Sequence, residues 1–440
     1  MKKERSIVEL YGDDPERAEA ELFGRRTGVS RRGFLGGAGL AGMTAAVGGV
    51  AIPFAASMPG GLIPAAMAQT ADAPEPFDFP GKSPGLVSLG DRPLVAETPE
   101  HMLDDETTPY ENFFIRNNGT PPEPPADPDA WVVTIDGFVD TPLELTLGEL
   151  KSRFEHHTRH TVLECGGNGR AFFNPPGRGN QWTNGGASCG EWTGAKLSDV
   201  LRAAGIRPEA IYTAHFGADI HLSGDLDREV ISRGVRLEKA MADECMVVWG
   251  MNGGPLPDIH GGPVRLLIPG WPGSASHKWL RKITLRDVEH DGPGMTGTSY
   301  RMPIRPMIPG SDPDPDNFAI MESMPLRSII TNPANGTVLP AGTRSLALRG
   351  AAWNGDVGVK AVHLSTDFGQ TWQAATLADP RNAYDWRRWT AEVSLPLDGY
   401  YEVWVRATDD NDLMQPHVAA NWNPQGYGGN PMHRIAVLVA

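Results

Sequence analysis

Cysteine is scarce in this chain of 440 residues, and its three cysteines lie far apart. Cys165, Cys189 and Cys245 form neither a CxxC nor a CxxCH pattern. This spacing argues against a zinc ribbon, a thioredoxin-like redox pair and covalently attached haem, so we expect no haem in this chain. Cys189 and Cys245 are expected to be buried and inert, as free cysteines usually are.

Positive charge is also in deficit, because 39 Lys and Arg stand against 54 Asp and Glu, which gives a formal net charge of −15. Such a balance argues against binding to nucleic acid or to an anionic membrane surface. Hydrophobic residues make up 40% of the chain, enough for more than one core. The 52 Gly and 39 Pro are typical of a loop-rich protein of short strands rather than of a helical bundle.

An export signal is predicted over residues 1–68. Arg31 and Arg32 precede a stretch rich in Gly and apolar residues, and Ala66-Met67-Ala68 offers a cleavage site. This pattern resembles a twin-arginine signal, which predicts a periplasmic protein that is exported in folded form and has no membrane span after cleavage. A membrane anchor is the alternative, but the glycines and Pro53 count against it.

The rest of the chain predicts an α+β fold with two domains. Residues 69–107 are polar and Pro-rich, which favours an N-terminal extended arm. Residues 108–302 mix strand-like runs with short helical patterns such as 195–201 and predict a mixed α/β domain. Residues 303–325, rich in Pro, Asp and Ser, are typical of a linker. Short alternating runs in residues 326–440, separated by turn residues, predict a small antiparallel β-sandwich.

Cys165 is the candidate reactive residue. It ends an apolar strand pattern and opens a glycine-rich turn, Cys165-Gly166-Gly167-Asn168-Gly169-Arg170. A thiol placed in this way is either a nucleophile or a soft ligand for a metal such as molybdenum or copper. A nucleophile would need a histidine base, although no nucleophile signature surrounds the cysteine. Three histidines lie just upstream: His156, His157 and His160.

Several motifs resemble those of the sulfite oxidase family of molybdopterin enzymes. The turn at residues 165–170 is similar to the family's C-x-G-N-x-R motif. Further matching segments lie at residues 112–117, 192–197, 251–257, 260–265, 277–280, 365–372 and 422–426. The resemblance implies a molybdopterin-binding catalytic domain over residues 108–302 and an immunoglobulin-like dimerisation domain over residues 326–440. It therefore also implies a homodimer or a heterotetramer.

The resemblance implies roles for individual residues. Cys165 would bind molybdenum, and fixed cations with turn amides would hold the phosphate of the cofactor, molybdenum-molybdopterin. The residues that would bind the cofactor are Asn112, Phe113, Asn117, Asp219, Ser232, His260, Arg265, Ser276 and Lys278. A sulfur oxyanion is strongly hydrated and needs several preorganised donors. The matching substrate-pocket residues are Arg116, Arg170, Trp182 and Tyr300.

Two positions depart from the animal and plant members of the family. Gln425 stands where those enzymes have an arginine that completes the anion pocket, and Asn118 stands where a histidine usually follows Arg-Asn. Removing one positive charge should weaken binding of a small free dianion and favour a neutral or tethered sulfur. The changes are similar to those in the molybdenum subunit of sulfane dehydrogenases, which act on sulfane sulfur attached to a carrier protein during thiosulfate oxidation.

The expected function is therefore oxidation of a sulfur compound by oxygen-atom transfer. Electrons would leave to a c-type cytochrome, since this chain has no haem attachment site. One alternative is a sulfite dehydrogenase that acts on free sulfite. A metal-free secreted binding protein on the same scaffold is another, and a cysteine hydrolase built on Cys165 is the third.

Overall fold

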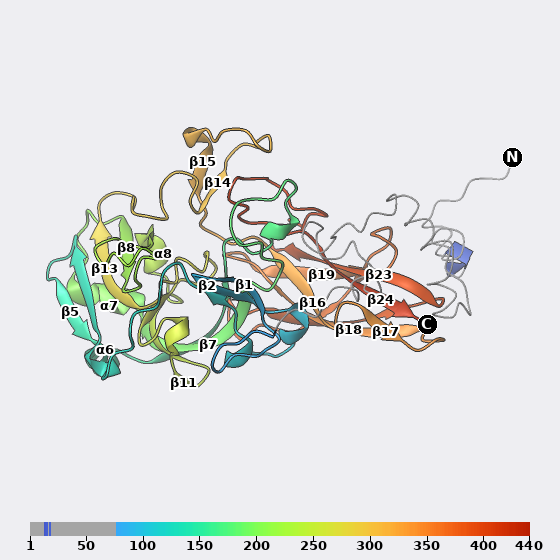
Figure 1. Ribbon diagram of the computed structural model, residues 1–440, viewed down its shortest axis with the longest axis horizontal. Coiled ribbons are helices and arrows are strands. Elements are labelled where there is room, and N and C mark those ends of the chain that lie inside the picture. The colour runs from blue at the N-terminus through green and yellow to red at the C-terminus, as the bar shows by residue number, and fades with distance from the viewer. Residues whose placement is uncertain (1–12, 16, 19–75) are drawn as a thin grey trace.

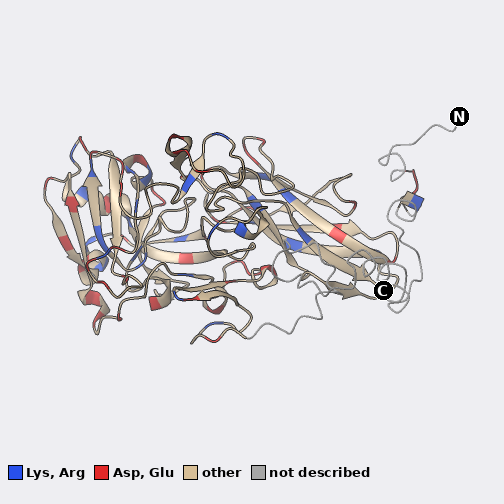
Figure 2. Ribbon diagram, turned by 45° about the horizontal axis from the view of Figure 1, so that its top comes forward, with Lys and Arg blue, Asp and Glu red and all other residues tan. Residues whose placement is uncertain are grey.

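The computed structural model describes residues 13–15, 17–18 and 76–440 (Figure 1). The predicted export signal therefore lies almost entirely outside the described residues. The molecule is elongated, with α6–α8 and strands such as β5, β8 and β13 at one end and strands β16–β24 at the other (Figure 1). Both signs of charge are distributed over the two ends (Figure 2).

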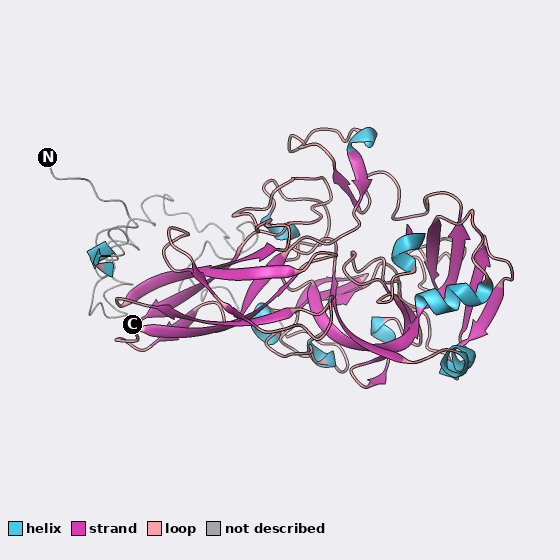
Figure 3. Ribbon diagram, turned by 180° about the vertical axis from the view of Figure 1, so that it is seen from behind, coloured by secondary structure: helices cyan, strands magenta, loops and turns pink. Residues whose placement is uncertain are grey.

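Strands dominate the described chain, and its helices are short (Figure 3). The α-helices beyond residue 76 are α6 (Leu147–Arg153), α7 (Leu197–Ala204) and α8 (Leu237–Ala240). The 3-10 turns are η2 (Glu100–Met102), η3 (Tyr110–Asn112), η4 (Pro128–Ala130), η5 (Arg170–Phe172), η6 (Asp258–His260) and η7 (Pro315–Asn317). The fold is thus more β-rich than the predicted α+β mixture. Within the described residues, no helix has the length and apolarity needed to cross a bilayer.

Two five-stranded sheets form the part of the molecule between residues 132 and 286. One has the order β5-β4-β13-β8-β9, and in the other β6, β7, β10 and β11 lie side by side while β12 also pairs with β10. The strands of the first sheet are β4 (Val132–Gly137), β5 (Leu143–Thr146), β8 (Tyr212–Gly217), β9 (Ser232–Arg236) and β13 (Leu280–Arg286). Those of the second are β6 (His157–Glu164), β7 (Ala187–Lys196), β10 (Met246–Met251), β11 (Gly254–Pro255) and β12 (Arg265–Leu267).

One hydrophobic core joins these two sheets, with α7 packed into it. Leu197, Val200, Leu201 and Ala204 of α7 are buried, and their spacing places them on one helical face. The helix ends at Gly205, whose φ of 72° suits glycine. The predicted helical pattern at residues 195–201 thus starts two residues early, since β7 runs to Lys196.

The stretch predicted as an extended arm takes part in the folded structure. It forms β1 (Val87–Asp91) and β2 (Leu94–Glu97), and β2 pairs with β3 (Ile115–Arg116). Val95 and Leu103 are fully buried. A two-stranded ribbon that projects from the body spans the predicted boundary between domain and linker: β14 (Arg301–Pro303) ends at the first linker residue, and β15 (Phe318–Ile320) lies within the linker (Figure 1).

The C-terminal part consists of two sheets that enclose a second core. Their orders are β16-β18-β22-β21 and β17-β24-β23-β19-β20. Burial alternates along β23, as expected for a strand with one face on a core. The strands are β16 (Arg327–Asn332), β17 (Thr337–Leu339), β18 (Ser345–Trp353), β19 (Val359–Ser365), β20 (Gln373–Ala374), β21 (Thr376–Leu377), β22 (Arg387–Ser394), β23 (Gly399–Asp409) and β24 (His433–Val439). The immunoglobulin-like topology and the exact domain boundaries stay predictions.

Glu164 joins the two parts directly beside the candidate cysteine. Its carboxylate forms an ion pair with Arg327 of β16, and both side chains are at most 2% exposed. The Trp353 indole donates to Glu164 Oε2 at 2.8 Å, and Asn168 Nδ2 donates to Oε1 at 2.9 Å. The C-terminal part therefore helps to fix the end of β6, where Cys165 follows.

Candidate active site

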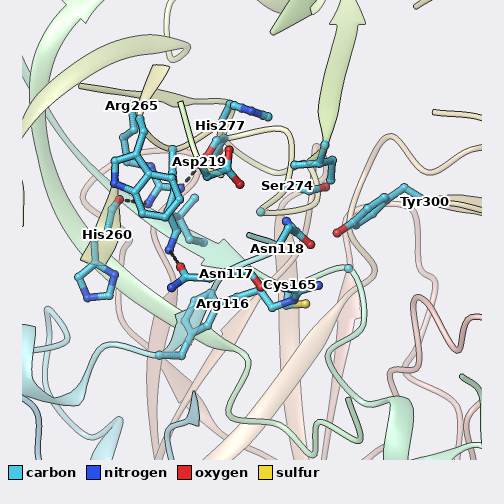
Figure 4. Close-up of a pocket in the computed structure, with 18 of the residues that line it drawn as sticks. Arg116, Asn117, Asn118, Cys165, Asp219, His260, Arg265, Ser274, His277 and Tyr300 are labelled. Atoms are coloured by element: carbon cyan, nitrogen blue, oxygen red, sulfur yellow. Dashed lines mark hydrogen bonds between the residues drawn. The ribbon is translucent and has the colours of Figure 1, made fainter. Parts of the chain in front are cut away.

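An open cavity of about 710 Å³ lies where Cys165 leaves β6. Figure 4 shows Cys165, Asn118 and Tyr300 gathered at one end of the cavity and Arg265 and His260 at the other. The lining residues are Phe113, Phe114, Arg116, Asn117, Asn118, Leu163, Cys165, Gly166, Asp219, Ile231, His260, Arg265, Gly273, Ser274, Ser276, His277, Lys278, Trp279 and Tyr300.

The turn that carries Cys165 is held by the side chain of Asn168. Asn168 Oδ1 accepts a hydrogen bond from Gly186 N at 3.0 Å, and its amide donates to Glu164. Gly167 is needed because a Cβ there would lie 2.3 Å from the Arg170 guanidinium. The C-x-G-N-x-R pattern is therefore explained locally: Asn168 fixes the turn, and Gly167 makes room for Arg170. Cys165 is 8% exposed and is the one cysteine that lines the cavity.

Buried cations form the end of the cavity away from Cys165. Arg265 is 3% exposed and donates to the backbone carbonyls of His260, at 2.8 Å, and Ser276, at 2.6 Å. Burial lowers the pKa of Arg265 to about 9. Lys278 Nζ donates to Asn117 Oδ1 at 2.5 Å, and burial, with Arg265 nearby, holds the pKa of Lys278 well below its usual value.

Lys82, from the N-terminal stretch, extends this group of cations. Its Nζ lies 2.7 Å from His260 Nε2 and donates to the carbonyls of Tyr110, at 2.5 Å, and Phe113, at 3.0 Å. Burial lowers the pKa of Lys82 to about 7. Burial and the neighbouring cations lower the pKa of His260 well below its usual value, so the imidazole is neutral. Its Nε2 therefore accepts from Lys82, and its Nδ1 carries the proton.

The buried basic side chains Lys82, Arg265 and Lys278 together fit an anionic ligand such as the phosphate of a pyranopterin. Within the described residues, neither Lys82, Arg265 nor Lys278 forms an ion pair with a carboxylate. The Asn117 amide nitrogen is buried and has no hydrogen-bond partner there. Buried charges normally occur with a partner, so several buried cations and an unused donor favour a bound anion. Asp219, whose pKa burial raises to about 6, lines the same cavity.

The Cys165 end of the cavity has less positive charge than the sequence predicts. Arg116 lines the cavity, but its guanidinium also donates to the Asn117 carbonyl. Tyr300 directs its hydroxyl toward Cys165 and Asn118 (Figure 4). Arg170 is absent from the lining, because its guanidinium donates to the carbonyls of Asn180 and Gln425.

Four other predicted site residues also lie outside the cavity lining. Trp182 is fully buried behind Phe114, with ring centroids 5.9 Å apart. Gln425 contributes its carbonyl to Arg170, and its side chain donates to Thr298 at 3.1 Å. The other two residues have partners outside the cavity lining. Asn112 Nδ2 donates to Met102 O, and Ser232 Oγ lies 2.8 Å from His290 Nε2.

The sequence does not mark Lys82, Ser274 or His277 as site residues, although Ser274 and His277 line the cavity and Lys82 contacts His260. No periodic pattern predicts that Lys82 is buried, because it lies in a Pro-rich stretch whose composition is typical of the protein surface. Ser274 and His277 flank the predicted Ser276 and Lys278 in one segment, so weighing every polar residue of that segment would have found them. None of the histidines upstream of Cys165 lines the cavity, whereas His260 and His277 do.

Comparison with known proteins identifies the family. The model of the oxidoreductase molybdopterin binding domain matches residues 119–293, and that of the Mo-co oxidoreductase dimerisation domain matches residues 318–440. Sulfite oxidase of Gallus gallus is 32% identical over 376 residues, which cover 82% of this chain and 80% of that protein. The chain belongs to the sulfite oxidase family of molybdopterin oxidoreductases. The predicted family membership is thus confirmed.

The chain is also similar to a nitrate reductase in sequence and to a sulfane dehydrogenase in structure. Nitrate reductase [NADH] 2 of Phaseolus vulgaris is 29% identical over 80% of this chain and 42% of its own length. The crystal structure of the sulfane dehydrogenase SoxCD from Paracoccus pantotrophus matches with a TM-score of 0.63 at 24% identity, covering 88% of this chain and 95% of that one. This last match shows a shared fold.

Membership of the sulfite oxidase family implies a molybdenum-molybdopterin cofactor, and the cavity residues fit it. Lys278, Arg265 and His260 would hold the anionic end of the cofactor. Cys165 at the other end would supply the soft sulfur ligand that molybdenum favours.

Proposed function

We propose that this chain is a periplasmic molybdenum oxidoreductase of sulfur. Its substrate would be sulfane sulfur attached to a carrier-protein cysteine in a thiosulfate oxidation pathway. Electrons would pass to a c-type cytochrome, either a bound subunit or a diffusing protein. The fold shared with a sulfane dehydrogenase supports this proposal.

The proposed substrate rests on one observation, that little positive charge lies beside Cys165. Of the two arginines expected there, Arg116 lines the cavity, whereas Arg170 is bound to backbone carbonyls. The side chain of Gln425 bonds Thr298 and adds no charge. A free dianion needs several preorganised cations to replace its water, and a sulfur held on a protein thiol needs fewer. The open cavity would admit the end of such a carrier.

Chain residues would bind and orient the reactants. When bound, the cofactor supplies the redox and oxygen-atom-transfer chemistry that amino-acid side chains lack. Arg116 and the Tyr300 hydroxyl would orient the sulfur group beside Cys165. Phe113, Phe114 and Leu163 line the cavity and would limit the water around the reacting group.

Turnover with two substrates tests this proposal. The protein is purified from its native host, molybdenum is quantified, and cytochrome c reduction is followed with carrier-bound sulfane sulfur or with free sulfite. We expect about one molybdenum per chain and a kcat/KM at least about tenfold higher, about 1.4 kcal/mol, for the carrier-bound sulfur. A higher kcat/KM for sulfite would overturn the substrate assignment.

Sulfite dehydrogenase activity on free sulfite is the second candidate. The 32% identity with sulfite oxidase favours it, and it predicts the reverse order of the two substrates. The metal-free binding protein predicts far less than one molybdenum per chain in freshly purified protein, with no turnover of either substrate. Fractionation of the host cells tests the periplasmic location, and light scattering tests whether the protein is a homodimer or a heterotetramer with a cytochrome subunit.

A further inference from the structure

Arg233 in β9 is a buried cation that the assigned site does not use. Its side chain is fully buried, and Nη1 donates to the Gly294 carbonyl at 2.7 Å and contacts the Met295 sulfur at 2.8 Å. Nε and Nη2 are buried without any hydrogen-bond partner in the described part of the chain. A buried guanidinium with two unused donors is costly, so it calls for a compensating ligand or charge.

The guanidinium lies against the cavity residue Tyr300. Its central carbon is 4.6 Å from the centroid of the Tyr300 ring. That ring also stacks on Tyr427, with centroids 5.0 Å apart and planes 15° apart, and Arg170 lies 5.5 Å from the Tyr427 centroid. Tyr300 has a φ of 48°, which non-glycine residues rarely adopt. These contacts fix the tyrosine in a conformation that its own backbone does not favour.

Among the residues that the structure describes, no carboxylate forms an ion pair with Arg233. Burial lowers the pKa of Arg233, and the groups that oppose this effect are the phenols of Tyr300, Tyr212 and Tyr427. The nearby Arg301, in contrast, forms an ion pair with Glu289 at 2.8 Å. The Tyr300 ring that Arg233 contacts lines the cavity, and so does Ile231, two residues before Arg233. An anion bound in that cavity would therefore supply the missing negative charge.

We propose that Arg233 is a positioning residue that holds Tyr300 and supplies the positive charge for a tetrahedral sulfur oxyanion in the cavity. It acts from behind the tyrosine and therefore compensates only in part for the charge that Gln425 lacks. The inference rests on the proposed oxidation of sulfur, and it applies to both candidate substrates, because an oxidised sulfur group is anionic in each case. A single charge set back behind a ring suits one anionic group better than a free dianion.

Sulfate binding to the molybdenum-loaded protein tests this role. Because the cofactor then occupies the basic end of the cavity, sulfate reports on the Cys165 end. The dissociation constant is obtained from the rise in unfolding temperature with sulfate concentration, at constant ionic strength. Arg233→Gln removes the charge and keeps a polar side chain. We expect its sulfate dissociation constant to rise at least about tenfold, because a unit charge near the anion is lost inside the protein.

Two further variants separate charge from structure. Arg233→Lys keeps the charge, and its sulfate dissociation constant should stay within about threefold of the wild-type value. Arg301→Gln removes a neighbouring arginine that has a carboxylate partner, and it should leave sulfate binding unchanged. Wild-type sulfate affinity in Arg233→Gln, or an equal loss in Arg301→Gln, would overturn the proposal. Sulfate binding is read without turnover, so a protein that binds sulfate but oxidises no sulfur would refute the proposed function alone.

Discussion

Lys82 Nζ lies 2.7 Å from Nε2 of His260, across a sequence separation of 178 residues. The lysine thereby makes the imidazole nitrogen that it faces an acceptor, and the proton stays on Nδ1. His260 lines the cavity beside Arg265 and Lys278, so Lys82 fixes the proton position of a cavity residue. The segment before β1 therefore takes part in the cofactor site.

Replacing Lys82 by Met is expected to weaken retention of the cofactor. Without the ammonium group, neither the tautomer nor the position of His260 is fixed, and one of the buried cations is lost. For histidines that bind a metal, partners of this kind typically contribute 10- to 100-fold in affinity or activity, and we expect an effect of similar size here. We expect Lys82→Met to lose molybdenum on dialysis at least about tenfold faster than the wild type, as measured by metal analysis.

Lys151 provides the matched control, because its ion pair with Asp129 is largely exposed. Lys151→Met should retain molybdenum as the wild type does. Equal molybdenum retention by Lys82→Met and wild-type protein would show that His260 is oriented without the lysine.

Cys165→Ser is expected to abolish sulfur oxidation while the fold is kept. The hydroxyl is a poor ligand for a soft metal, so we expect activity to fall at least about a hundredfold. The Cys165 thiol has no hydrogen-bond partner in the described structure that serine would disturb, and the unfolding temperature of the cofactor-free protein should change by less than about 2 °C. Activity and thermal unfolding measure the two effects separately.

Cys245 is the control for this exchange. It is fully buried, and burial raises the pKa of its thiol to about 12, so it is inert. Cys245→Ala should cost some stability and leave the molybdenum content unchanged. Retained oxidation in Cys165→Ser would contradict the ligand assignment.

The buried ion pair between Glu164 and Arg327 gives a prediction about stability. Arg327→Met leaves the Glu164 carboxylate buried without its cation, which typically costs about 3–5 kcal/mol. We expect a loss of this size in urea unfolding, together with lower activity, because Cys165 follows Glu164 directly. The double variant Glu164→Gln with Arg327→Met should recover part of the loss. An exposed pair sets the baseline: Lys360→Met, next to Asp412, should cost less than about 1 kcal/mol.

The sequence predicts the cavity better where motifs are local than where distant segments meet. The C-x-G-N-x-R turn locates Cys165, because Asn168 and Gly167 act within a few residues of it. Arg170 belongs to the same motif, yet its side chain turns toward the Gln425 carbonyl, 255 residues away. No local pattern records that contact.

The same distinction applies to the fold. Alternating runs such as residues 345–349 and 401–406 lie in β18 and β23, because their period reflects one buried face. The stretch of residues 69–107 reads as a surface arm by composition, whereas its described part packs between sheets and supplies Lys82. Tertiary burial of a polar, Pro-rich segment leaves no periodic signal, so such contacts emerge only from the three-dimensional structure.

Glu97 at the end of β2 makes stability depend on pH. Its carboxylate accepts from Thr183 N at 2.8 Å and Thr183 Oγ1 at 3.1 Å. Burial outweighs these hydrogen bonds and raises the pKa of Glu97 to about 7, against 4.5 for an ordinary glutamate. Between pH 4.5 and 7 the folded state thus binds more protons than the unfolded state. Glu97 therefore makes folding less favourable as pH rises through this window, and its full cost is present above pH 7.

Glu97→Gln removes this titration while keeping a similar shape. Relative to the wild type, we expect the stability of the variant to increase by up to about 3 kcal/mol between pH 4.5 and pH 8. Urea unfolding followed by Trp fluorescence at several pH values measures the difference, and comparing the two proteins cancels the other groups that titrate. Glu123→Gln, at an exposed position, should show no such trend. A difference between Glu97→Gln and wild type that stays constant from pH 4.5 to 8 would mean that Glu97 is ionised throughout, with its charge stabilised by Thr183.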